Sequence, residues 1–376
     1  MTDNSAHRTD ITVDENLNTI EGGSEIVISK KLDISHARSC TCPPTHINCL
    51  TPKEWIKCQL GVWQFNYENR DIRDKAKHPA TFPISLARRC IELFSHQGEL
   101  VLDPFMGSGT TLVAASDVNR NAIGFDIHPD YIALAQSRLN QDNLFFESKQ
   151  IPVLEDARHI AQYLAEGSIS CIVTSPPYAN LLNRKRLNKS RRGNDRKNEQ
   201  YLKVEQYSQR SEDLGTLDLD EYSKAMAEIF SGLLPFLKEK GHCVINVPDM
   251  WWENQRITIH VAVIEALRSV GYELRNTIIW DRMNIVNNVG IFGWPSNYIT
   301  MGTTFEYLLD FWRPPVASNG AQKGKVTTNE SSTDAAVKST ISNGSTSQPS
   351  KVSPSAGKFP HELEELLSQY SDDKQT

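Results

Sequence analysis

The sequence predicts an α/β protein with a doubly wound, mostly parallel sheet. Short apolar segments suited to buried strands alternate with amphipathic segments suited to helices, which is typical of repeated β-α-β units. A Gly-x-Gly turn at 107–109 connects one such strand to the helix that follows it. Sheets of this kind bind ligands at the carboxyl ends of their strands, so residues just after each strand are the candidates for function.

Composition narrows the class of protein. The chain has 376 residues and a net charge of −6, which excludes a uniformly basic DNA-coating protein but leaves room for a local basic surface. Its apolar runs are shorter than the ~18 residues that cross a bilayer, so we expect no membrane association. The first residues lack the apolar core of a signal peptide. We therefore expect a cytoplasmic protein whose seven cysteines are reduced.

Three regions are expected along the chain. Residues 1–45 are polar and predict a disordered leader, and residues 46–315 predict the folded domain. Residues 316–376 predict a disordered tail, because 316–357 contain ten Ser and five Thr but no Leu or aromatic residue. Such a stretch buries too little apolar surface to offset its ordering entropy. A short amphipathic helix is expected at 360–370.

The elements of the folded region follow from periodicity. Pro129 suits the first turn of a helix, Gly241 suits a helix end, and Pro235 would kink the helix that contains it. Helices are expected at 84–97, 110–118, 129–140, 221–241 and 257–270. Strands are expected at 99–103, 121–127, 169–174, 242–247, 272–280 and 305–312, with a weaker one just before Asp156.

The first chemical motif is VLDPFMGSGTTLVAA at 101–115. Its strand ends at Asp103, and Gly107 and Gly109 let the backbone approach a ligand closely. The free N–H groups of the helix that begins at Thr110 then suit a polar ligand. Leu112 stands where a dinucleotide fingerprint has its third glycine, which argues against a nicotinamide cofactor. The alternative is a plain strand-to-helix turn.

Two acids lie near the ends of the next two strands. Asp126 lies 23 residues after Asp103, close to the interval that places a carboxylate on ribose hydroxyls in nucleotide-binding α/β units. Asp156 ends the weaker strand and could reach an adenine edge. A helix-capping or solvated acid is the alternative at both positions, and it is the stronger alternative at Asp156.

The second motif is TSPPY at 174–178, directly after a buried strand. Pro176 and Pro177 fix the backbone and remove two N–H donors, which leaves carbonyls that only accept hydrogen bonds. Ser175 adds a hydroxyl and Tyr178 a flat ring. Acceptors beside an aromatic plate suit a planar group that bears an NH₂.

Together DPFMGSGTT and TSPPY resemble two motifs of the S-adenosylmethionine-dependent DNA amino-methyltransferases, which modify N4 of cytosine or N6 of adenine. HPATFPISLARRCIELF (78–94), GFD (124–126), VINVPD (244–249), IIWDR (278–282) and TFEYLLDFWRP (304–314) resemble further segments of that family. The resemblance implies a seven-stranded Rossmann-like methyltransferase sheet and S-adenosyl-L-methionine as cofactor. By it, Phe105, Gly107, Gly109 and Thr110 would line the methionine end, Asp126 the ribose and Asp156 the adenine.

The resemblance also implies the reaction. Ser175 and the Pro176 carbonyl would accept hydrogen bonds from the target amino group, and Tyr178 would stack on a base flipped out of the duplex. No metal is expected. Methylation of a ring carbon needs a nucleophilic Cys that its family carries in a Pro-Cys pair, and this chain has Cys42-Pro43 but no Pro-Cys.

The target and partners follow less directly. Ser before Pro-Pro resembles the cytosine-N4 members more than the adenine-N6 members, so we expect an N4-cytosine enzyme acting on double-stranded DNA, with N6-adenine as the alternative. RNA or protein amino-methylation is a weaker alternative, and a DNA-binding protein without activity is weaker still. A restriction-modification context, with a cognate restriction endonuclease acting on the same site, is expected.

A basic segment follows TSPPY. Residues 183–210 hold ten Lys/Arg against three Asp/Glu, with Tyr201 and Tyr207 interleaved. We expect the insertion at 183–215 to contact DNA, with a solvated charged loop as the alternative. The Asn-rich loop 284–302 could read base edges or simply pack, with neither favoured.

Four cysteines gather near the amino terminus: Cys40, Cys42, Cys49 and Cys58, with His36 and His46 among them. Their spacing lacks the paired CxxC knuckles that predict zinc strongly, so ordinary reduced thiols are the favoured interpretation and a zinc site is the alternative.

Overall fold

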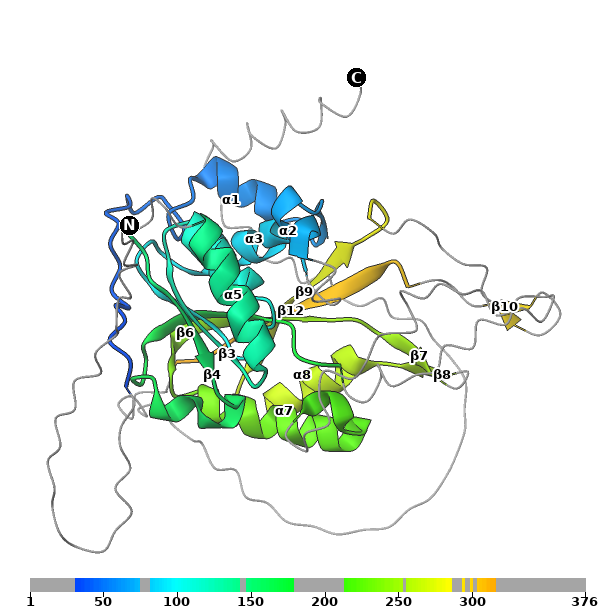
Figure 1. Ribbon diagram of the computed structural model, residues 1–376. Coiled ribbons are helices and arrows are strands. Elements are labelled where there is room, and N and C mark those ends of the chain that lie inside the picture. Colours follow the sequence, from blue (N-terminus) through cyan, green and yellow to red (C-terminus); the bar gives the residue numbers. More distant parts are fainter. Residues whose placement is uncertain are drawn as a thin grey trace, which may run out of the picture. The chain divides into compact units, whose positions relative to one another are not determined.

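The computed structural model describes residues 31–74, 82–142, 147–178, 213–252, 255–285, 293–294, 298–299 and 303–315 (Figure 1). The predictions for 1–30, for the basic segment 183–210 and for the tail at 316–376 lie outside these residues, as does most of the loop 284–302. Within the described part, no helix has the length and apolar character needed to span a membrane.

The architecture is an α/β sheet of eight strands, seven of the expected kind and one more at an edge. The sheet is parallel except for β12, which runs antiparallel to both of its neighbours. This confirms the predicted doubly wound, mostly parallel class. In spatial order the strands are β1 (Val62–Gln64), β9 (Glu273–Asp281), β12 (Phe305–Trp312), β6 (Leu237–Val247), β5 (Ile169–Thr174), β2 (Leu100–Asp103), β3 (Asn121–Asp126) and β4 (Gln150–Leu154).

Helices cover both faces of the sheet (Figure 1). One face carries α3 (Ile84–Phe94), α4 (Thr110–Asp117) and α5 (Pro129–Asp142), and the other carries α7 (Leu219–Leu233) and α8 (Ile259–Ser269). Smaller elements are α1 (Pro52–Cys58), α2 (Asn69–Asp74), the 3₁₀ turns η1 (Ala157–Gln162) and η3 (Leu214–Thr216), and the ribbons β7 (Met250–Trp252) with β8 (Gln255–Ile257) and β10 (Gly293–Trp294) with β11 (Tyr298–Ile299).

Alternate residues of a strand pack on opposite faces of the sheet. In β2, Val101 packs with the α3–α4–α5 layer, whereas Leu100 and Leu102 pack with the α7–α8 layer. Successive side chains of a strand point to opposite faces. A strand covered on both faces therefore needs a continuous apolar run, and all four residues of β2 are buried.

Two expected boundaries are wrong. The helix expected at 221–241 ends at Leu233, two residues before Pro235, because proline removes a backbone donor and clashes with the preceding turn. Strand β6 then begins at Leu237 rather than His242, with Lys240 at φ 62°. The short strand β1 was not expected, and it pairs with β9 to give the sheet its eighth strand.

The last part of the predicted leader packs against the domain. Ile34 is 8% exposed and belongs to the core on the α7–α8 face. The Leu32 amide donates to the Tyr163 carbonyl at 3.0 Å, and the Ser39 amide donates to the Gln97 carbonyl at 2.8 Å. Residues 31–45 are therefore ordered by contacts that a polar, aperiodic sequence did not reveal.

Candidate active site

A pocket opens at the carboxyl ends of β2, β3, β4 and β5, where the strand order reverses between β2 and β5. This switch point is where open α/β sheets bind ligands. Residues from both chemical motifs line it: Phe105, Gly107, Thr110, Asp126, Asp156, Ser175, Pro176, Pro177 and Tyr178. The structure thus brings together nine of the eleven predicted site residues.

Asp103 lies beneath the pocket rather than in its lining. Its side chain is 1% exposed and accepts hydrogen bonds from the Thr174 hydroxyl at 2.6 Å and from the Phe105 amide at 3.1 Å. Burial raises the pKa of this carboxyl to about 6. Asp103 therefore ties the end of β2 to the end of β5, which places the two motifs next to each other.

Gly109 also acts behind the pocket. It precedes α4 with φ 78°, and a Cβ at this position would lie 2.7 Å from the Cβ of Ala135 in α5. Glycine is required here both for the left-handed backbone and for the close approach of α5. The turn is held further by Arg138, whose Nη1 donates to the Ser108 carbonyl at 2.9 Å and to the Thr110 hydroxyl at 3.1 Å.

Asp126 is an acid of the pocket lining at the end of β3. One carboxylate oxygen accepts from the Gly107 amide and the other from the His128 amide, each at 2.9 Å. Burial raises the pKa of this carboxyl to about 7, although both amide bonds favour the charged form. Each oxygen retains a second lone pair for a ligand hydroxyl.

Asp156 has two partners of its own. Its side chain caps η1 by accepting from the Arg158 amide at 2.7 Å, and its other oxygen accepts from the Arg158 guanidinium at 3.0 Å. The helix-capping alternative is therefore correct for this residue, and it also lines the pocket.

Ser175 lies at the carboxyl end of β5 between two partners. Its Oγ is 2.9 Å from the Tyr178 hydroxyl and donates to the backbone carbonyl of Asn246 at 3.3 Å. Asn246 belongs to β6, so the neighbouring strand fixes the serine rotamer. The side-chain amide of Asn246 donates to the Glu306 carboxylate at 2.7 Å, and Glu306 forms an ion pair with Arg282.

Asp213 is one of the pocket residues that sequence reasoning missed. It is 3% exposed, one oxygen accepts from the Gly215 amide at 2.8 Å, and Oδ2 has no hydrogen-bond partner among the described residues. A buried carboxylate oxygen without a donor is costly unless a ligand supplies one. Four acidic residues line the pocket: Asp126, Glu155, Asp156 and Asp213.

Comparison with known families decides the assignment. The family model described as DNA methylase, of the N6/N4 type, matches residues 29–137 and 169–365, which is most of the chain. The chain belongs to this family. Its members are S-adenosylmethionine-dependent DNA amino-methyltransferases, and S-adenosylmethionine is the cofactor of the family.

Curated relatives resemble shorter stretches. The chain is 38% identical over 88 residues to the Type II methyltransferase M.HpaI of Haemophilus parainfluenzae, covering 23% of this chain and 28% of that protein. It is 36% identical over 114 residues to M.BglI of Bacillus subtilis, covering 30% and 31%. The orphan methyltransferase M.BamHII of Bacillus amyloliquefaciens is 40% identical over 84 residues, covering 22% and 32%. The matched stretches thus span about a third or less of these relatives.

Among solved structures, the chain is similar to TrmN from Thermus thermophilus, with a TM-score of 0.40 and 16% identity over 64% of this chain and 51% of that one. A methyltransferase from Streptococcus mutans in complex with SAH gives a TM-score of 0.36 and 14% identity over 62% and 98%.

Proposed function

We propose that this methylase transfers a methyl group from S-adenosylmethionine to the exocyclic N4 amino group of cytosine in duplex DNA. One observation carries the proposal: the glycine turn and the Ser-Pro-Pro-Tyr turn line the same pocket. A cofactor site and an amino-group site must lie within reach of each other for direct transfer. Methylation of adenine N6 is the second candidate, because it needs the same apparatus.

The pocket residues suit the parts of the cofactor. The Asp126 carboxylate, fixed by two backbone amides, is placed to accept from ribose hydroxyls. Asp156 is assigned to the adenine edge. The unpaired Oδ2 of Asp213 suits a cationic or N–H-bearing group, which the methionine end of the cofactor provides. When bound, the cofactor supplies a sulfonium methyl group as the electrophile.

Ser175 is proposed as the acceptor for the target amino group. A hydroxyl has one proton and two lone pairs. Because the proton is directed at the Asn246 carbonyl, Oγ can accept from Tyr178 and from one substrate N–H. An exocyclic nitrogen is a poor nucleophile while its lone pair is delocalised into the ring. Fixed acceptors at Ser175 and the Pro176 carbonyl draw that nitrogen toward tetrahedral geometry, so preorganised dipoles provide the acceleration.

The substrate must leave the duplex to reach these acceptors. The amino group cannot enter a pocket while it is paired within the helix, so base flipping is part of the proposal. Pro177 and Tyr178 border the pocket and offer apolar and aromatic surface to the extruded base. Stacking on Tyr178 would offset part of the cost of unpairing.

The preference for cytosine over adenine rests on Ser175. The proposed cytoplasmic restriction-modification context rests on the Type II relatives. Nucleoside mass spectrometry tests the target directly. DNA from a methylation-free host that expresses the chain should contain N4-methylcytosine, and DNA from the Ser175→Ala host should contain far less. N6-methyladenine alone would replace cytosine with the second candidate. Unmodified DNA alongside modified RNA or protein would contradict both.

A further inference from the structure

A cluster of four potential metal ligands lies away from the pocket. The ligand atoms of Cys40, Cys42, Cys49 and His96 all lie within 4.8 Å of one another. The first three belong to the segment that precedes α1, and His96 lies in the turn between α3 and β2. Cys58, which the sequence grouped with the three cysteines, is not among the four. The structure replaces it with a histidine that lies 47 residues beyond Cys49.

The distances among three of the four ligand atoms are close to those around one tetrahedral ion. The Cys40 sulfur is 3.3 Å from the Cys49 sulfur, and His96 Nδ1 is 3.4 Å and 3.5 Å from these two sulfurs. Zinc bonds of about 2.3 Å to sulfur and 2.0–2.1 Å to nitrogen, arranged tetrahedrally, separate two sulfurs by about 3.8 Å and sulfur from nitrogen by about 3.5 Å. A disulfide would join only two of the four groups and would leave Cys42 and His96 without a role.

The backbone around the cluster is arranged to present these side chains. Cys49 has φ 77° and Asn48 has φ 46°, a left-handed pair that is costly for residues other than glycine. The pair is held by the side-chain amide of Asn48, which donates to the Leu93 carbonyl at 2.6 Å. Arg120 donates to the backbone carbonyl of Asn48 at 3.4 Å. Strain of this kind persists where the surroundings impose it, and here it turns the Cys49 thiol toward His96.

Outer contacts orient the ligands as metal sites require. The Gln97 amide lies 3.5 Å from the Cys49 sulfur and donates to it. The Arg38 guanidinium donates to the carbonyls of Cys40 and Cys42 at 2.9 Å and 3.3 Å. The positive charge of Arg38 beside the thiol groups would offset part of the charge of bound thiolates.

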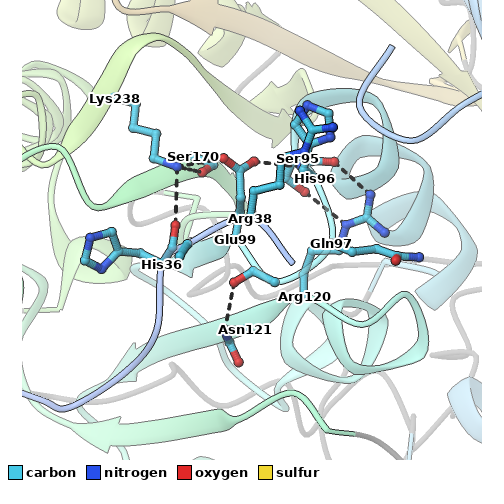
Figure 2. Close-up of polar contacts among 12 residues, drawn as sticks. His36, Arg38, Ser95, His96, Gln97, Glu99, Arg120, Asn121, Ser170 and Lys238 are labelled. Carbon is cyan, nitrogen blue, oxygen red and sulfur yellow. Dashed lines mark hydrogen bonds and ion pairs between the residues drawn. The ribbon is translucent and has the colours of Figure 1, made fainter. Parts of the chain in front are cut away.

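A chain of polar contacts connects the cluster to the sheet (Figure 2). The His96 amide donates to Glu99 at 2.7 Å, and Lys238 of β6 donates to the other oxygen of Glu99 at 2.7 Å. Lys238 also contacts the Ser170 hydroxyl of β5 at 2.7 Å. Arg120 donates to the Ser95 carbonyl at 2.7 Å beside the same turn. The turn that carries His96 is thus fixed to β5 and β6 at their amino ends.

We propose that Cys40, Cys42, Cys49 and His96 form a structural Zn²⁺ site. Four protein ligands leave no open position, so the ion is structural rather than catalytic. It joins the segment 31–50 to the turn before β2. The cofactor pocket lies at the opposite, carboxyl ends of the strands, so the proposal is independent of the methyl-transfer proposal.

Metal analysis of the purified full-length chain tests this. Protein from a zinc-supplemented culture, desalted after brief incubation with excess zinc, should contain one zinc per chain by mass spectrometry. Cys40→Ser, Cys49→Ser and His96→Gln should each lose most of it. Cys58→Ser is the matched control and should retain it, because Cys58 lies on the adjacent helix but outside the cluster. Retention by all three ligand variants, or less than a tenth of an equivalent in the wild type, would overturn the site.

Two measurements on the unmodified chain guard against variants that fail to fold. X-ray absorption at the zinc edge should show three sulfurs and one nitrogen. Cobalt substituted for zinc should give the visible absorption of a tetrahedral thiolate site. A spectrum dominated by oxygen ligands, or a Cys40–Cys49 disulfide found by peptide mapping of protein kept under reducing conditions, would contradict the proposal.

Discussion

At the scale of single residues, the pocket combines positions that sequence could identify with one that it could not. Asp126 ends β3 and Ser175 directly follows β5. Because the carboxyl ends of parallel strands meet at one edge of a sheet, the proximity of these two residues could be predicted. Asp213 lies near the end of the segment 183–215 and directly before a 3₁₀ turn, so no strand end marked it. Its only sequence signal was an acid before Leu-Gly, and an ordinary capping residue has the same pattern.

Replacing Asp126 should weaken cofactor binding. Asp126→Ala removes a charge-assisted hydrogen bond to the ribose, which costs about 1.5–3 kcal/mol, or roughly ten- to hundredfold in Kd. Titration calorimetry with S-adenosylmethionine measures this. Asp130→Ala is the control, because Asp130 is exposed in the first turn of α5. Equal affinities for the Asp126 variant and the wild type would remove Asp126 from the cofactor site.

The raised pKa of Asp126 has a consequence for stability. Its folded pKa is about 7, above the value of about 3.9 expected for the unfolded chain. Between these values the folded state holds a proton that the unfolded state has lost, so this group makes the unfolding free energy fall as pH rises from 4 to 7. Asp126→Asn should flatten that part of the profile. Urea unfolding without cofactor at pH 5, 6, 7 and 8 measures the slope, and an equally steep variant would contradict the assignment.

Ser175 and Tyr178 should affect turnover rather than cofactor binding. Removing one preorganised oxyanion-hole donor typically costs about 10²–10³ in kcat, and we expect a loss of similar size when Ser175→Ala removes a preorganised acceptor. Tyr178→Phe keeps the ring and loses only the hydroxyl that contacts Ser175, so its loss should be smaller than that of Tyr178→Ala. Single-turnover methylation of a duplex separates these variants. A tenfold weaker cofactor Kd in Ser175→Ala would instead indicate a cofactor ligand.

At the scale of elements, the sequence predicted each strand that is buried on both faces. The continuous apolar runs of β2, β3 and β5 predicted buried strands clearly. Strand β1 gave no such signal, because it is three residues long and its first and last residues are exposed. Apolar periodicity extends through Leu233 and Leu237 without a break, so only Pro235 marked the change from α7 to β6. The proline was read as a kink, and tertiary pairing of β6 with β5 made it a helix end.

Substitution of Gly109 tests the packing of α4 against α5, and substitution of Gly232 in α7 is the comparison. Gly109→Ala should destabilise the fold by about 1–3 kcal/mol, since it places a side chain at positive φ and against Ala135. Gly232→Ala adds a methyl group at an exposed position of α7 where no atom lies within 4 Å, and it should stabilise the fold by about 0.5–1 kcal/mol. Urea midpoints compare the two. A neutral Gly109→Ala would show that α5 can move away.

At the scale of the whole molecule, charge is divided unevenly. The chain is acidic overall at −6, yet residues 183–210 carry ten Lys/Arg against three acids, so the rest is more acidic than the total. The residues outside 183–210 therefore carry a net negative charge, which opposes DNA binding except where a basic surface faces the DNA. The segment begins five residues after Tyr178 in the sequence, and its own structure lies outside the described residues.

We therefore expect the basic segment to dominate the salt dependence of DNA binding. If about four or five of its cations contact phosphates, the slope of log K against log salt is roughly −4, from about 0.9 per phosphate. Neutralising Arg184, Lys185, Arg191 and Arg192 should flatten that slope by up to roughly 3–4 while cofactor affinity stays unchanged. Fluorescence anisotropy on specific and random duplexes at several salt concentrations measures both terms. Uniform weakening would mean that the segment positions the duplex, and weakening confined to the specific duplex would mean that it reads bases. An unchanged slope would place the DNA surface elsewhere, because cations that release no counterions are not in contact with phosphates.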